Sequence, residues 1–134
     1  MPLIRIDLLE GRSREYGAEV GQIVYQALTD VMKAPQNDLF QIITEHPKAG
    51  LQFDRDFLGI HRSDDCIFVQ ITLNVGRTLE MKRSFYKAVA DGLHENLKLR
   101  KEDVFISLVE VPKENWSFGN GEAQLAPSPG QTTP

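Results

Sequence analysis

Residues 2–13 read PLIRIDLLEGRS, and residues 67–78 read IFVQITLNVGRT, the same pattern 65 positions later (67 minus 2). In both stretches apolar residues alternate with other residues, and a Gly-Arg pair and a hydroxyl residue follow. The alternation predicts a strand with one buried face. The glycine and the hydroxyl residue predict a turn followed by a helix cap. These two stretches therefore indicate a duplicated unit, which constrains the fold more than any single local pattern.

The repeat continues without a gap through most of the chain. At the same offset, two copies of about residues 3–47 and 68–112 align. The matching positions are Ile6/Ile71, Leu8/Leu73, Gly11/Gly76, Arg12/Arg77, Glu15/Glu80, Val24/Val89, Leu28/Leu93, Lys33/Lys98, Asp38/Asp103, Phe40/Phe105, Glu45/Glu110 and Pro47/Pro112.

Each copy predicts a strand, a helix and a second strand. In the first copy we expect a strand over 3–9, a helix capped by Ser13 and running to about Lys33, and a strand over 39–43. In the second copy we expect strands over 67–75 and 104–111, with Thr78 capping the helix between them. Two β-α-β units predict an α/β (α+β) fold, with a four-stranded mixed sheet and both helices on one face.

The remaining segments lie outside the repeat. Residues 48–65 carry two glycines and scattered charges, which predicts a long irregular connection. Residues 115–121, Asn-Trp-Ser-Phe-Gly-Asn-Gly, suggest a short C-terminal hairpin closed by a Gly-Asn-Gly turn. We expect one domain over 1–125 and a disordered Pro-, Gly- and Thr-rich tail over 126–134.

Composition limits the functional classes. The 134 residues are 41% hydrophobic and 25% charged, with a formal net charge of −4. This charge argues against nucleic acid or an anionic membrane as the main partner, and no apolar run is long enough to span a membrane. The three histidines and the single cysteine, Cys66, show no metal-ligand spacing. We therefore expect a cytoplasmic protein without metal or cofactor, in which Cys66 is a small buried apolar residue.

Pro2 is the residue with the clearest chemical potential. Processing removes an initiator methionine that precedes so small a residue, which leaves a secondary amine at the head of a strand. An α-amino group has a reference pKa of about 7.7 to 8.0, so its surroundings decide whether it acts as an acid or a base. Met-Pro is also an ordinary way for a chain to begin, and that reading stays open here.

The repeat also predicts which residues lie near Pro2. If a local two-fold axis relates the copies, the end of strand 67–75 lies beside the start of strand 3–9. Arg77 and Asp38 then approach Pro2, which brings a guanidinium and a carboxylate to an amine. Both residues have counterparts in the other copy and can also be structural parts of a turn. Pro2 has no such counterpart, because Ile67 occupies the matching position.

Trp116 and Phe118 stand two positions apart, so on a strand they would point to the same side. They can cover the sheet or a subunit contact, or they can line a pocket. An apolar wall is what an amine with a shifted pKa requires.

These features together resemble the tautomerase superfamily, and within it malonate semialdehyde decarboxylase and its homologues. The likeness rests on Pro2, the doubled β-α-β unit, Glu10-Gly11-Arg12, the segment Thr44-Glu-His-Pro47, and the segment Asn115-Trp-Ser-Phe-Gly119. It implies a homotrimer with sites near subunit contacts. It also implies roles for six residues: Pro2 as acid or base, Asp38 as the assisting carboxylate, Arg77 as the carboxylate-binding arginine, and Trp116, Phe118 and Leu125 as an apolar wall.

One position departs from the decarboxylase pattern. That pattern carries a second arginine just upstream of the one matched by Arg77, and here the place is taken by Asn74 or Val75. Three functions therefore remain open. The first is decarboxylation of a small oxo carboxylate, with a possible hydratase side activity; the second is keto-enol tautomerisation with Pro2 as base; the third is a trimeric binding module without enzymatic activity.

Overall fold

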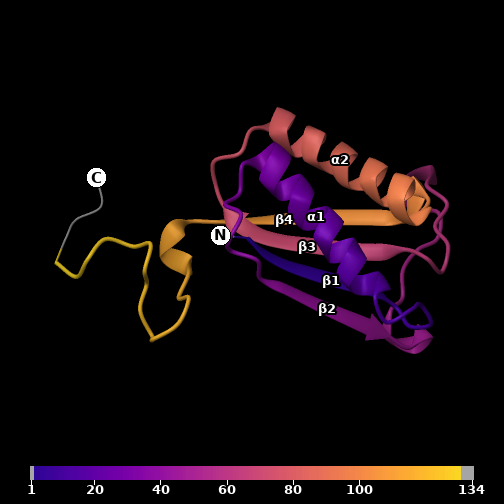
Figure 1. Ribbon diagram of the computed structural model, residues 1–134, viewed down its shortest axis with the longest axis horizontal. Coiled ribbons are helices and arrows are strands. Elements are labelled where there is room, and N and C mark those ends of the chain that lie inside the picture. Colours follow the sequence, from indigo (N-terminus) through magenta and orange to yellow (C-terminus); the bar gives the residue numbers. More distant parts are fainter. Residues whose placement is uncertain (1, 131–134) are drawn as a thin grey trace.

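The computed structural model describes residues 2–130. Its main elements alternate between strands and helices in the order expected from the repeat (Figure 1). They are β1 (Leu3–Leu9), α1 (Tyr16–Met32), β2 (Gln41–His46), β3 (Ile67–Asn74), α2 (Leu79–Leu97) and β4 (Val104–Val111). Four short 3-10 turns, η1 (Lys48–Gly50), η2 (Phe57–Gly59), η3 (Lys101–Asp103) and η4 (Lys113–Asn115), lie in the connections.

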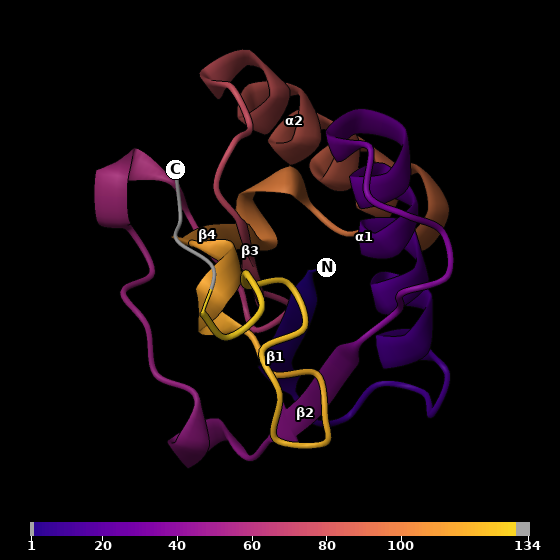
Figure 2. The same ribbon diagram turned by 90° about the vertical axis from the view of Figure 1, so that its left-hand side faces the viewer.

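The four strands form one mixed sheet in the order β2-β1-β3-β4. Strands within a repeat are parallel, and the central pair, β1 and β3, is antiparallel with Leu3 opposite Thr72. Both helices cover the same face of the sheet, while residues 47–65 run along the other side (Figure 2). The predicted fold class, the sheet and the placement of the helices are therefore confirmed.

The core lies between the sheet and the helices. The central strands contribute every second residue to it. Ile4, Ile6 and Leu8 of β1 are at most 2% exposed. The helices contribute residues spaced three or four apart, which meet the sheet as a continuous apolar stripe. The buried members from β3 and α2 are Ile67, Val69, Ile71, Leu73, Phe85, Val89 and Leu93.

The two helix caps differ. The Thr78 hydroxyl accepts a hydrogen bond from the backbone N–H of Met81 at 3.1 Å, as predicted. Ser13 does not do so: Glu15 is the cap residue of α1, and only the carbonyl oxygen of Ser13 takes part, accepting from the Tyr16 N–H at 3.1 Å. The prediction of a Ser13 side-chain cap was wrong because a turn precedes the helix and places Ser13 too early.

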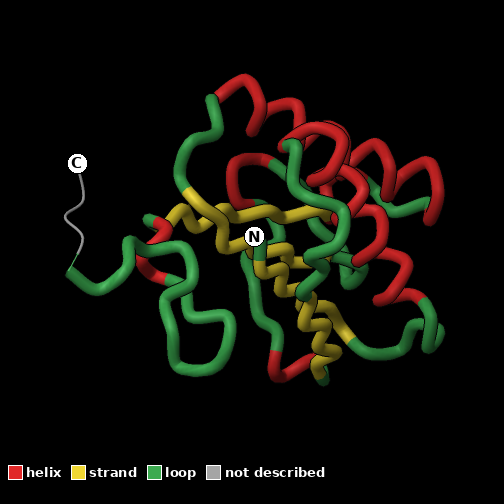
Figure 3. The backbone as a smooth tube through the Cα atoms, turned by 60° about the vertical axis from the view of Figure 1, so that its left-hand side comes forward, coloured by secondary structure: helices red, strands yellow, loops and turns green. Residues whose placement is uncertain are grey.

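The expected C-terminal hairpin is absent from the described residues, since no strand follows β4. The Gly-Asn-Gly turn does form, and Asn120 has a left-handed φ of 60°. The segment on either side is loop, drawn in green after the last strand in Figure 3. It finds no partner strand because it leaves the sheet at the end of β4 and extends beyond the ends of the strands (Figures 1 and 3). The tail prediction concerns residues 126–134, of which 131–134 lie outside the described residues.

Candidate active site

A pocket of about 240 Å³ lies at the end of the sheet where β1 begins. Pro2 is buried at this place, and the antiparallel register of β1 and β3 puts it beside the end of β3. The wall is mainly aromatic, and its aromatic residues come from two segments that are distant in sequence. The lining residues are Pro2, Leu3, Phe40, Trp116, Ser117 and Phe118. The structure thus brings Trp116 and Phe118 to Pro2, and it adds Phe40 and Ser117, which the sequence did not single out.

The aromatic wall is ordered by contacts within the C-terminal loop. The rings of Trp116 and Phe118 stack with centroids 5.4 Å apart and planes 18° from parallel. Gln124 closes the loop: its side-chain oxygen accepts from the Phe118 N–H at 2.9 Å and its amide donates to the Gly119 carbonyl at 2.8 Å. Leu125 follows directly and is 37% exposed, but it does not line this pocket.

Arg77 reaches the same region through Asn74. Its Nη1 donates to the carbonyl oxygen of Asn74 at 3.1 Å, and the guanidinium is half-buried. The side-chain oxygen of the same asparagine accepts from the Trp116 indole Nε1 at 2.7 Å. Arg77 does not line the pocket itself, but one residue joins it to the aromatic wall. Sequence reasoning considered Asn74 only as a place where an arginine is lacking.

Asp38 lies in the loop that enters β2, and it is only 5% exposed. The segment that contains it runs beside the first residues of β1, because Ile4 donates its N–H to the Phe40 carbonyl at 3.0 Å. The Tyr25 hydroxyl donates to the Gln36 carbonyl and holds the preceding turn. A buried carboxylate is therefore placed near the same end of the sheet as Pro2.

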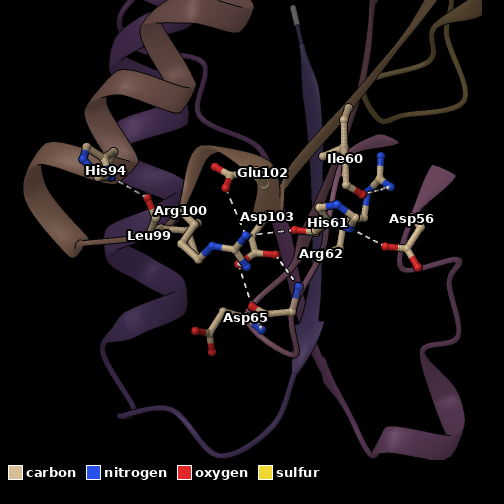
Figure 4. Close-up of polar contacts among 11 residues, drawn as sticks. Asp56, Ile60, His61, Arg62, Asp65, His94, Leu99, Arg100, Glu102 and Asp103 are labelled. Atoms are coloured by element: carbon tan, nitrogen blue, oxygen red, sulfur yellow. Dashed lines mark hydrogen bonds and ion pairs between the residues drawn. The ribbon is translucent and has the colours of Figure 1, made fainter. Parts of the chain in front are cut away.

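The opposite end of the sheet carries the second-repeat counterpart of Asp38 and the first-repeat counterpart of Arg77, and Pro2 does not lie there. Asp103, the counterpart of Asp38, is fully buried and accepts from the Ser63 N–H at 2.7 Å and from its hydroxyl at 2.6 Å. Arg100 lies 3.6 Å from the same carboxylate (Figure 4). The Arg77 counterpart, Arg12, pairs with Asp65. These contacts join the 48–65 connection to the second repeat and to the turn after β1, so they have a structural role at this end.

The single cysteine is placed unfavourably for catalysis. Cys66 is 1% exposed, and burial raises the pKa of its thiol to about 11, so it is a protonated apolar residue at neutral pH. Among residues 2–130 there is no group of three or more His, Cys, Asp or Glu side chains that could hold a metal ion. Within the same range, neither helix is long and apolar enough to cross a membrane.

Comparison with known proteins shows the family. Models of a family described as "Tautomerase enzyme" match residues 38–119 and 2–57. A curated relative, "Probable tautomerase YusQ" of Bacillus subtilis (strain 168), is 37% identical over 93% of this chain and 98% of its own. This chain belongs to the tautomerase family.

Solved structures agree with this assignment. A malonate semialdehyde decarboxylase described in wild-type, mutant and inactivated forms has a TM-score of 0.84 at 28% identity, over 92% of this chain and 95% of its own. The FG41 malonate semialdehyde decarboxylase inhibited by 3-bromopropiolate has a TM-score of 0.83 at 36% identity, over 91% of this chain and 92% of its own. A fused 4-OT, described as a symmetric trimer, shares the fold at 20% identity with a TM-score of 0.74, over 92% of this chain and 97% of its own.

Proposed function

We propose that this tautomerase-family enzyme decarboxylates a small oxo carboxylate, with Pro2 as its catalytic group. The observation that carries the proposal is the apolar pocket that contains Pro2, whose Trp116 wall is linked through Asn74 to Arg77. An amine, a carboxylate-binding arginine and a wall that excludes water are the parts this reaction requires.

In the proposed reaction, Pro2 carries its proton and Arg77 holds the substrate carboxylate. The buried Asp38 carboxylate favours the charged amine. Protonated Pro2 polarises the carbonyl oxygen, the bond between the carboxylate carbon and its neighbour breaks, and carbon dioxide leaves. The electron pair of that bond forms the carbon–carbon double bond of an enol, whose oxygen takes the proton from Pro2. A solvent proton then adds to carbon while the enol oxygen returns its proton to Pro2. The aromatic wall assists because the carboxylate loses its charge as carbon dioxide forms. Hydration of an unsaturated acid would use the same groups as a side activity.

Keto-enol tautomerisation is the second candidate function. The names of the curated relatives favour it, because the similar Bacillus subtilis proteins are called probable tautomerases. Here Pro2 acts without its proton, takes a proton from carbon and returns it to another atom of the substrate. The two reactions therefore differ in the charge of one nitrogen.

We also propose a homotrimer in the cytoplasm. The face of the sheet that the helices leave uncovered exposes apolar side chains, including Phe105 at 41% and Val109 at 37%. Edge strand β2 exposes Ile42 and Ile43 at 41% and 37%. A contact between copies would bury these side chains.

A panel of small 2-oxo and 3-oxo acids tests the proposal, with carbon dioxide and enol measured separately. We expect carbon dioxide from at least one 3-oxo acid. Arg77→Ala should raise KM by about tenfold to a hundredfold, the effect of losing a charge-assisted hydrogen bond to the carboxylate. Arg12→Ala is the matched control and should leave KM unchanged, because Arg12 pairs with Asp65 at the other end of the sheet. Enol exchange without carbon dioxide would support the tautomerase instead.

A further inference from the structure

Asn74 contacts two residues of the proposed site from one position at the end of β3. Its side-chain oxygen accepts from the Trp116 indole, 42 positions away, and its main-chain oxygen accepts from Arg77. We propose that Asn74 is a positioning residue, which fixes the aromatic wall relative to the carboxylate-binding arginine and thereby sets the affinity for oxo carboxylates. This inference rests on the proposed function.

The orientation of the Asn74 amide follows from chemistry. An indole N–H is only a donor, so the group that faces it must be the amide oxygen and not the amide nitrogen. An acceptor at position 74 is therefore required for this contact. Aspartate also supplies one, whereas leucine has a similar volume and supplies none.

The backbone of Asn74 makes it a rigid anchor. Asn74 pairs with Val111 in the β3–β4 ladder, and the next residue, Val75, donates its N–H to the Val111 carbonyl at 3.1 Å. Trp116 lies on a loop with no strand partner among the described residues, so the indole bond ties a loop to the sheet. A loop that is bonded to a strand has a smaller range of side-chain positions than a loop held only by its own contacts.

The contact with Arg77 has a complementary effect. A guanidinium has five N–H donors in a fixed plane, and one Nη1 donor is directed at the Asn74 carbonyl. This contact restrains the guanidinium and leaves its other donors for a substrate carboxylate. Because both contacts come from one residue, they tie the indole and the guanidinium to the same point at the end of β3.

The chain has one tryptophan, so its indole N–H signal in proton–nitrogen NMR spectra reports this contact alone. We expect Asn74→Leu to move the signal upfield and Asn74→Asp to keep it near the wild-type position. Asn96→Ala is the control: its amide also makes a side-chain hydrogen bond, to Gly92 at 2.8 Å, but at the far end of α2. An unchanged indole signal in Asn74→Leu would overturn the positioning role of Asn74 and would leave the proposed function unaffected.

Titration with pyruvate, followed by the same signal, measures the affinity of the folded protein without requiring turnover. We expect Asn74→Leu to weaken binding about five- to tenfold, as for the loss of one neutral hydrogen bond. Asn74→Asp should weaken it further despite its intact indole contact, because its charge competes for Arg77. Wild-type affinity in Asn74→Leu would mean that the contact is merely structural and would overturn the inference. A wild-type protein that neither binds nor converts any oxo acid would remove the proposed function, and the positioning role with it.

Discussion

Removal of the Asp103 carboxylate is expected to destabilise the fold and leave the active site intact. The carboxylate is fully buried and accepts hydrogen bonds from the Ser63 N–H and hydroxyl at 2.7 and 2.6 Å. A hydrogen bond to a charged group contributes about 1.5–3 kcal/mol, and such contributions are not additive when they share one acceptor. We therefore expect Asp103→Ala to lower the free energy of unfolding by about 3 kcal/mol.

The assay is urea unfolding followed by far-ultraviolet circular dichroism, at one protein concentration for all variants. Asp103→Asn keeps an oxygen acceptor for the Ser63 N–H, so it should cost only about 1–2 kcal/mol. The kcat/KM of the same variants is measured as well. The folded Asp103 variants should retain the wild-type kcat/KM. Asp38→Asn, at the matching position of the first repeat, should lose most of its kcat/KM. A cost below about 1 kcal/mol for Asp103→Ala, or a loss of activity equal to that of Asp38→Asn, would refute the assignment of the two ends.

Three further predictions concern the described contacts. Thr78→Ala should lower the free energy of unfolding by about 1 kcal/mol, because it removes a helix cap. Ser13→Ala should change the free energy of unfolding by less than about 0.5 kcal/mol, because only the backbone of Ser13 takes part. Urea unfolding of the two variants and the wild type measures both values. Cys66 should resist iodoacetamide at pH 8 in the native protein and react fully in denaturant, since burial raises its pKa to about 11; mass spectrometry shows this, and rapid native labelling would contradict it. Asp91 has its pKa lowered to about 2, first by Lys101 and then by a second lysine. A pKa lowered on folding stabilises the protein above the ordinary value of 3.8, and this stabilisation is lost as the pH falls toward about 2. Asp91→Asn should therefore lower the urea midpoint at pH 6 and lower it much less at pH 2. An equal difference at both pH values would refute the assignment.

The elements that the sequence predicted well are those with a local or repeated signal. The alternation of β1 and β3 and the register of the repeat were enough to predict the antiparallel centre of the sheet. That pairing in turn predicted that Arg77 and Asp38 approach the Pro2 end. The pairing of β1 with β3 is confirmed, and the approach of Arg77 and Asp38 to Pro2 stays a prediction that rests on this symmetry argument.

The parts that the sequence did not predict depend on tertiary contacts. Trp116 and Phe118 alternate as strand residues do, but the segment has no neighbouring strand among the described residues and becomes a loop that Gln124 closes. The hydrogen bond from the Trp116 indole to Asn74 was not predicted, because it joins residues 42 positions apart. The signal that could have identified more of the wall is sequence position, since Phe40 stands two residues after Asp38.

The central claim is that the Pro2 amine performs the chemistry, and one comparison tests it most directly. Intact mass first establishes that Met1 has been removed, and carbon dioxide release from a 3-oxo acid is then measured for the wild type and for Pro2→Ala. Because a positioned acid or base contributes about 10²- to 10⁴-fold, we expect Pro2→Ala to lower kcat by at least about a hundredfold. Equal turnover by both proteins would contradict the account.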